Sequence, residues 1–129
     1  FADIEVYAGM DEKTGKMQTE ARKHPVTIHQ LLIHTSGLTY EMHAEHHPVA
    51  KLYKQSYAER APLSLEGMVN HLLNFPLAYQ PGTRWHYSVS TDVCARLVEI
   101  ISGQSIDRFL QQRIFDPLGM EDTGYHVPV

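Results

Sequence analysis

Hydrophobic residues recur at helical spacing through most of this chain. They form one stripe in "LEGMVNHLLN" (65–74) and broader stripes in "STDVCARLVEIISG" (90–103) and "IDRFLQQRIF" (106–115). Apolar residues three or four positions apart share one face of an α-helix, so each segment is predicted to be an amphipathic helix. The inward positions expected for the last two helices are Val93, Cys94, Leu97, Val98, Ile100, Ile101, Ile106, Phe109, Leu110, Ile114 and Phe115.

Short polar signals mark where the helices begin and end. Thr27 and Gln30 form a capping box for "IHQLLIH" (28–34), and we expect Gly37 to stop that helix. The last helix is expected to end before Asp116-Pro117, because a residue that precedes proline disfavours the helical region. The N-caps expected for two further helices are Ser64 and Ser105.

The first two dozen residues have a different pattern. "IEVYAGM" and "MQTEA" are short extended segments on either side of the polar turn "DEKTGK", which predicts a β-hairpin. The chain is therefore expected to be a single domain over 1–129, with a hairpin segment (1–24) and a helical region (25–129). Its expected fold class is mainly α with a small N-terminal β-hairpin.

Nine histidines raise the question of a metal site, above all in "HAEHH" (43–47). On a continuous helix His43 and His47 would share one face, as paired zinc ligands do. However, Pro48 argues against a continuous helix, and no spacing rule supplies a third ligand. We expect a solvated polar loop, and no metal or cofactor.

Composition and charge exclude some classes of function. The chain has 129 residues and a formal net charge of −4, which gives no basic surface for nucleic acid. No run approaches the roughly 20 apolar residues of a membrane-spanning helix. The one cysteine excludes an internal disulfide. No signal-peptide pattern is present, and the sequence leaves the compartment open, whether cytoplasmic or periplasmic.

The stretch "PGTRWHYSVSTDV" (81–93) places three aromatic or titratable side chains directly before a predicted helix. Pro81 and Gly82 predict a turn, and Ser88 or Ser90 is expected to cap the helix. Trp85 is interpreted as a core or pocket-wall residue, and His86, which has no assigned partner, is expected at the surface. Tyr87 either covers the core with its hydroxyl in water or takes part in chemistry.

Four ordered motifs decide between these alternatives. They are "LLIHTSGL" (31–38), "PGTRWHYS" (81–88), a helix ending in "ISG" (101–103) and "IFDPLGMEDTGY" (114–125). In this order they closely resemble the serine β-lactamase-like hydrolases, a family of class C β-lactamases, related carboxylesterases and penicillin-binding proteins. The triad "KTG" (13–15) is also a signature of such enzymes, but its place in a hairpin turn argues against that role here.

The resemblance implies a catalytic role for Tyr87, which matches the tyrosine that acts as general base in this family. A phenol of reference pKa about 10 can accept the proton of a serine nucleophile if neighbouring cations favour its anion. Trp85 and Val89 are then expected to contact the substrate. Val89 stands where β-lactamases have the asparagine that binds the β-lactam amide, which favours an ester substrate.

Part of the family's machinery is absent from the 129 residues, because no serine is followed by lysine three positions later. The resemblance thus implies the helical region of a β-lactamase/transpeptidase-like α/β fold without its main sheet. We expect the chain to be a fragment that is inactive alone, whose exposed apolar face leads it to self-associate. The alternatives are a fragment of a β-lactamase or penicillin-binding protein, and a non-catalytic binding relative.

Overall fold

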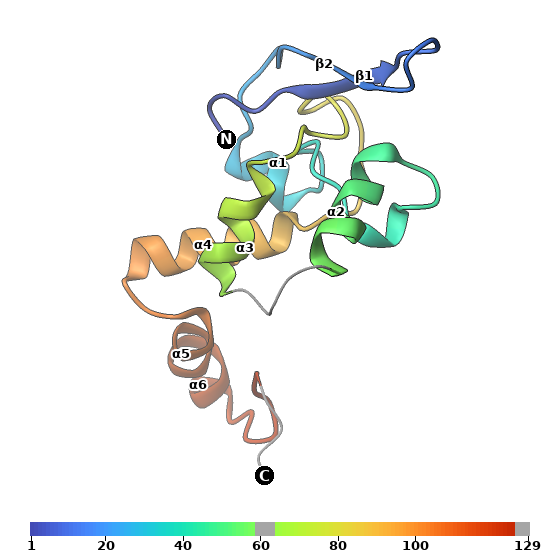
Figure 1. Ribbon diagram of the computed structural model, residues 1–129. Helices are drawn as coiled ribbons and strands as arrows, with labels where there is room; N and C mark the ends of the chain where they lie inside the picture. Colours follow the sequence, from blue (N-terminus) through green and yellow to red (C-terminus); the bar gives the residue numbers. More distant parts are fainter. Residues whose placement is uncertain (59–63, 126–129) are drawn as a thin grey trace. The chain divides into compact units, whose positions relative to one another are not determined.

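The computed structural model describes residues 1–58 and 64–125, and the chain divides into two compact units, Phe1–Cys94 and Ala95–Val129 (Figure 1). The elements are mostly helices, and the strands described are the two of an N-terminal hairpin. This confirms the predicted fold class. Among the described residues no helix has both the length and the apolar character needed to cross a membrane.

The hairpin consists of β1 (Val6–Met10) and β2 (Met17–Glu20), which pair antiparallel. The Asp11 carboxylate accepts hydrogen bonds from the backbone N–H groups of Lys13 and Thr14, at 3.0 and 2.7 Å, and so shapes the turn. The "KTG" triad therefore lies in a hairpin turn, as its polar surroundings predict.

Helix α1 (Ile28–Leu32) begins with the predicted capping box of Thr27 and Gln30. Its end differs from the prediction, because the helix stops at Leu32. The first residue after it with positive φ is His34 (φ 55°), three positions before Gly37 (φ 87°). A turn in the left-handed region breaks the run of helical hydrogen bonds, and here a histidine adopts it instead of the glycine.

A 3-10 turn, η1 (Glu41–His43), leads into α2 (Pro48–Ala58). Pro48 is the first residue of α2, where its missing N–H leaves no helical acceptor unsatisfied. Helix α3 (Leu65–Leu72) starts at the predicted N-cap, since the Ser64 side chain accepts from the Gly67 N–H at 3.1 Å. The hairpin is tied to the segment after α3, because Tyr7 N–H donates to Leu77 O and Leu77 N–H donates to Glu5 O, both at 2.8 Å.

The core of the first unit lies where the hairpin, α1, α2 and α3 meet the segment around Leu77. Its buried side chains come from all of these parts of the chain, so the elements there stabilise one another by packing. Those that are fully buried come from all of these parts except α1. The largest of them are Tyr53, Leu38, Leu72, Leu77, Val6 and Val49.

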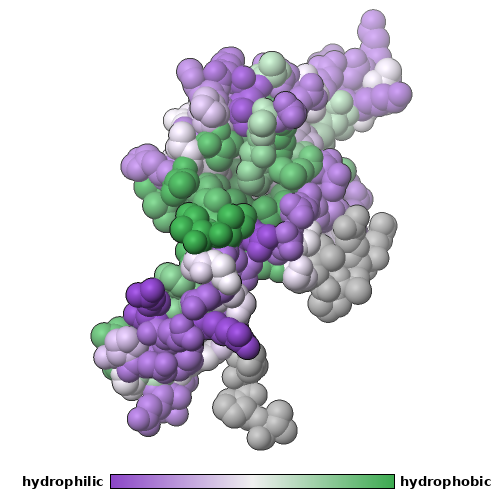
Figure 2. Space-filling model, turned by 90° about the vertical axis from the view of Figure 1, so that its left-hand side faces the viewer, coloured by the Kyte–Doolittle hydropathy of each residue, from purple (hydrophilic) through white to green (hydrophobic). Residues whose placement is uncertain are grey.

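Helix α4 (Ser90–Ser102) covers the predicted segment, but its buried face is narrower than expected. Val93 is 3% exposed, whereas Ile100 and Ile101 are 61% and 79% exposed. An apolar stripe shows which face of a helix avoids water, but burial requires another element opposite it. Within the described part of the second unit, no residue covers these two isoleucines. Figure 2 shows hydrophobic atoms gathered together on the face that it draws.

The second unit continues with α5 (Ile106–Leu110), a π-helical turn η2 (Gln111–Phe115) and α6 (Asp116–Leu118). The prediction that the helix ends before Asp116 is wrong, since Asp116 has helical angles (φ −60°, ψ −50°). The π turn ends there and Pro117 falls in the first turn of α6, where an N–H is not required. The five hydrophobic side chains of α5 and η2 that are expected to face inward are at most half-buried, and Ile114 is 40% exposed.

Candidate active site

Tyr87 lies in the segment that leads from the Pro81-Gly82 turn into α4. Gly82 has a φ of 81°, as the predicted turn requires, and Thr83 N–H donates to Gln80 O at 3.2 Å. The phenol of Tyr87 is 47% exposed and the indole of Trp85 is 66% exposed. Both side chains therefore stand at the surface of the first unit, and the neighbouring Val89 is buried at 4% exposure.

The backbone on both sides of Tyr87 is hydrogen-bonded to the loop that follows α1. His86 N–H donates to His34 O at 2.8 Å, and Val89 N–H donates to Thr39 O at 3.2 Å. In addition, the His43 ring donates from Nε2 to the carbonyl of Tyr87 at 3.1 Å. A tyrosine that is exposed at its side chain is thus fixed at its main chain.

Two rings flank the phenol of Tyr87. The imidazole of His34 lies 4.8 Å away, centroid to centroid, at an interplanar angle of 33°, and the ring of Tyr40 lies 6.1 Å away. Burial raises the pKa of the Tyr40 hydroxyl, with smaller contributions from Asp92 and Glu41. Tyr40 therefore keeps its proton more firmly than an ordinary tyrosine, which makes it a poor proton acceptor.

A second group of rings surrounds His86, the residue before Tyr87. His86 contacts His43 at 4.4 Å and Tyr79 at 5.0 Å between centroids, and its Nε2 is hydrogen-bonded to Thr39 Oγ1 at 2.9 Å. Burial, together with smaller contributions from the nearby His43, His47 and Arg84, lowers the pKa of His86 to about 4. His86 is therefore neutral near pH 7. It was expected at the surface with no assigned partner, whereas the structure has it half-buried and hydrogen-bonded to Thr39.

Three buried serines connect α4 to the loop after α1. Ser36 Oγ lies 2.8 Å from Ser90 Oγ, which lies 2.7 Å from Ser88 Oγ. Ser88 Oγ also accepts from the Ser90 N–H at 3.4 Å, so of the two predicted capping serines it is Ser88 whose side chain meets the first residue of α4. None of these serines is followed by lysine at the third position, so they do not form the nucleophile motif of the family.

The two histidines considered as metal ligands have other partners. His47 is buried, with its ring edge-on to Tyr7 and Tyr79, and its Nδ1 accepts from the Val49 N–H at 3.2 Å. His43 is engaged with His86 and the Tyr87 carbonyl. Within 1–58 and 64–125, no three His, Cys, Asp or Glu side chains are placed to hold a metal ion.

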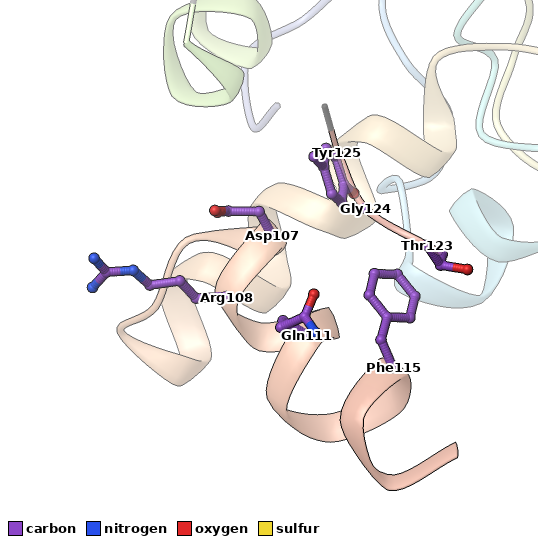
Figure 3. A pocket seen from close by; sticks show the side chains of 7 residues that line it. All are labelled: Asp107, Arg108, Gln111, Phe115, Thr123, Gly124 and Tyr125. Carbon is purple, nitrogen blue, oxygen red and sulfur yellow. The ribbon is translucent and has the colours of Figure 1, made fainter. Parts of the chain in front are cut away.

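The second unit contains a hollow of its own, with a volume of about 310 Å³ (Figure 3). The ring of Phe115 borders it, and the Arg108 side chain extends away from it. Among the described residues that line it, the ionisable side chains are those of Asp107, Arg108 and Tyr125. The residues that line it are Asp107, Arg108, Gln111, Phe115, Thr123, Gly124 and Tyr125.

The arrangement around Tyr87 can be compared with known families. The family model described as beta-lactamase matches residues 7–129. The chain belongs to the beta-lactamase family. This confirms the resemblance that the four ordered motifs indicate.

Within the beta-lactamase family, the curated relatives include esterases and an acyltransferase. Lovastatin esterase of Penicillium rubens is 36% identical over 79% of this chain and 25% of its own length. Esterase EstB of Burkholderia gladioli is 35% identical over 78% of this chain and 26% of its own length. Monacolin J acid methylbutanoyltransferase of Aspergillus terreus is 31% identical over 93% of this chain and 28% of its own length. The chain therefore spans about a quarter of the length of these relatives.

Solved structures of beta-lactamase-family relatives have the same fold over the matched part. Unliganded simvastatin synthase from Aspergillus terreus, as its selenomethionyl derivative, aligns with a TM-score of 0.67 and 29% identity over 91% of this chain and 28% of that protein. EstCE1, a hydrolase with promiscuous acyltransferase activity, aligns with a TM-score of 0.66 and 26% identity over 89% of this chain and 29% of that protein. The mainly helical chain thus has the fold of one region of these enzymes.

Sequence reasoning singled out Tyr87 and Trp85 but missed the residues that surround them. His34, His43 and His86 were interpreted as helix-end, loop and surface residues, and the structure brings all three to the Tyr87 segment. For His34 a signal was available, because it directly precedes "TSGL" within the first of the four motifs. His86 likewise lies within the second motif, "PGTRWHYS" (81–88). No local signal marks His43, whose partners His86 and Tyr87 lie more than 40 positions away in the chain.

Proposed function

We propose that this chain forms the helical part of a serine hydrolase that acts on esters, and that Tyr87 is its general base. One observation carries the proposal: the Tyr87 phenol is 47% exposed while the backbone around it is hydrogen-bonded to a second loop. A general base must reach the proton that it removes and must be held in place while doing so.

In the proposed reaction a serine hydroxyl attacks the ester carbonyl carbon, and Tyr87 Oη, as phenolate, accepts the serine proton. The resulting tetrahedral intermediate expels the alcohol, which takes the proton back from Tyr87. Water then attacks the acyl-enzyme in the same way, giving the carboxylic acid and the free serine. The serine and its lysine partner would come from a part of the protein outside these 129 residues, which contain no Ser-x-x-Lys.

An ester is favoured over a β-lactam for two reasons. Val89 has no amide with which to bind a β-lactam side chain, and its own side chain is buried at 4% exposure. The relatives named above include two esterases. Trp85, at 66% exposure beside Tyr87, is proposed to form part of the wall against which the substrate binds.

The test uses the whole protein that contains this chain. We expect it to hydrolyse p-nitrophenyl butyrate faster than a cephalosporin, and Tyr87→Phe to lower kcat by about 100-fold or more, the usual range for loss of a general base. Tyr125→Phe, which removes a hydroxyl from another exposed tyrosine, is the matched control and should leave kcat unchanged. Full activity of Tyr87→Phe would refute the role of Tyr87, and faster cephalosporin hydrolysis would favour a β-lactamase.

Acyl transfer to an alcohol is the second function to consider, because relatives include a methylbutanoyltransferase and a hydrolase with acyltransferase activity. The first half of the reaction is the same, and an alcohol replaces water in the second half. Adding a primary alcohol to the assay distinguishes the two outcomes: a transferase forms the new ester, whereas a strict hydrolase forms only the acid.

A further inference from the structure

His34 is the side chain nearest to the proposed base among the aromatic rings around it. Its imidazole lies 4.8 Å from the Tyr87 ring, although the two residues are 53 positions apart in the sequence. The interplanar angle of 33° means that the two rings are tilted relative to one another, closer to parallel than to perpendicular. Imidazole and phenol faces in such a position restrict each other's rotation.

The backbone conformation of His34 sets it apart from the rest of the described chain. Within 1–58 and 64–125 it is the one non-glycine residue with positive φ, at 55°. Glycine adopts this conformation at no steric cost, whereas other residues pay for it. The conformation turns the chain after α1, and a histidine here places an imidazole where glycine would place nothing.

The imidazole of His34 also contacts the buried serines. Its Nδ1 lies 3.4 Å from Ser88 Oγ, which continues through Ser90 to Ser36. Ser36 Oγ accepts the Leu38 N–H, and its own hydrogen is then free to point to Ser90. If each hydroxyl donates to the next, the series ends with Ser88 donating to Nδ1, and the neutral ring carries its proton on Nε2.

His34 therefore contacts the residues on both sides of Tyr87. Its carbonyl accepts from the N–H of His86 at 2.8 Å, and its ring meets the hydroxyl of Ser88. The side chain of Tyr87 lies between these two anchors, with the centroid of the imidazole 4.8 Å from that of its ring. The arrangement fixes the phenol relative to the start of α4.

We propose that His34 is a positioning residue for Tyr87, which holds the phenol in the orientation that proton transfer needs. It does not exchange protons with the substrate. This inference rests on the proposed function, in which Tyr87 is the general base. A misplacement of about 1 Å in a reacting group can cost up to about 100-fold in rate, so a ring that stops Tyr87 from rotating affects kcat more than substrate binding.

The experiment is a double-mutant cycle in the whole protein with a p-nitrophenyl ester as substrate. His34→Asn removes the ring but tolerates the left-handed conformation, which asparagine adopts more readily than most residues. His34→Gly is the second variant, because glycine has no strain at this φ and keeps the test valid if the asparagine variant folds poorly. His29→Asn, at an exposed histidine on α1, is the matched control.

We expect His34→Asn and His34→Gly to lower kcat by about 10-fold with KM changed by less than about 2-fold, whereas His29→Asn changes neither. In the Tyr87→Phe background the same substitutions should cause no further loss, because His34 acts through the Tyr87 hydroxyl. A merely structural role would instead lower activity equally in both backgrounds.

Two results would overturn the proposal in different ways. If Tyr87→Phe is inactive but the His34 variants keep full kcat, or lose the same factor in both backgrounds, the positioning role is wrong and the proposed function stands. If Tyr87→Phe keeps full activity, the proposed function is wrong, and the positioning role with it.

Discussion

Gly37 lies directly against the backbone carbonyl of Tyr79, so closely that a Cβ at position 37 would be 2.1 Å from the oxygen. The Gly37 carbonyl also accepts the N–H of Ala78 at 2.7 Å. This contact joins the loop after α1 to the segment that leads to Tyr87, and it depends on the absence of a side chain. The glycine of "HTSGL" is therefore explained by packing between two backbones.

We expect Gly37→Ala to destabilise the chain by about 3 kcal/mol or more, since it combines a backbone clash with a φ of 87°. Gly15→Ala is the matched control, because Gly15 has a φ of 65° but no atom within 4 Å of the added Cβ. It should cost only the backbone strain of about 1 kcal/mol. Urea unfolding measures both, and equal losses would show that the contact with Tyr79 is unimportant.

The stability of the fold should depend on pH through His86. Its pKa is lowered to about 4 in the folded chain, mainly by burial, whereas a histidine in the unfolded chain titrates near 6.5. The unfolded state therefore binds more protons between these values, and stability falls as the pH drops from about 6.5 towards about 4. His47, whose pKa is also lowered by burial, adds to the effect.

His86→Gln should reduce this pH dependence, because glutamine retains a polar group near Thr39 but does not titrate. The urea midpoint at about pH 7.5 and about pH 5 gives the comparison, and His29→Gln serves as control at an exposed site. An unchanged difference between the two pH values in the His86 variant would show that other groups cause it.

The capping box of α1 offers a local test. Thr27 Oγ1 accepts from the Gln30 N–H at 3.2 Å, and the Gln30 side chain accepts from the Thr27 N–H at 3.0 Å. Thr27→Ala should cost about 1 kcal/mol in the free energy of unfolding, while Thr27→Ser, which keeps the hydroxyl, should cost a few tenths at most. Equal losses for the two variants would assign the effect to the lost methyl group.

Trp85 should affect substrate binding more than stability. Its indole is 66% exposed, so Trp85→Ala is expected to change the free energy of unfolding by less than about 0.5 kcal/mol. In the whole protein we expect it to raise KM for esters with bulky apolar groups while kcat changes little. An unchanged KM for such esters would remove Trp85 from the proposed substrate wall.

Self-association of the 129-residue chain is expected at its exposed apolar positions. Ile28 and Leu32, one turn apart on α1, are 57% and 66% exposed, and a second copy of the chain can cover them. Light scattering at increasing concentration should show a dimer or larger species, and Leu32→Lys should shift it towards monomer because burying the new charge is unfavourable. A wild-type chain that stays monomeric at high concentration would refute this expectation.

The sequence by itself determined the elements and the family. Local signals are enough for this, since a capping box such as that of Thr27, a polar turn such as 11–16 and an apolar stripe act over a few residues. The helix ends were predicted less well: His34 took the left-handed position expected of Gly37, and Asp116 stayed helical before proline because a π turn intervened. Both cases depend on hydrogen bonds that sequence spacing does not reveal.

Only the tertiary structure decided which side chains surround Tyr87. The tyrosine itself stood out because four ordered motifs place it, but His34, His43 and His86 acquire their partners through contacts between segments more than 40 residues apart. Such contacts arise when the loop after α1 packs against the segment before α4, with Gly37 allowing the close approach. Periodicity describes one element at a time, whereas the environment of an exposed phenol depends on two loops meeting in space.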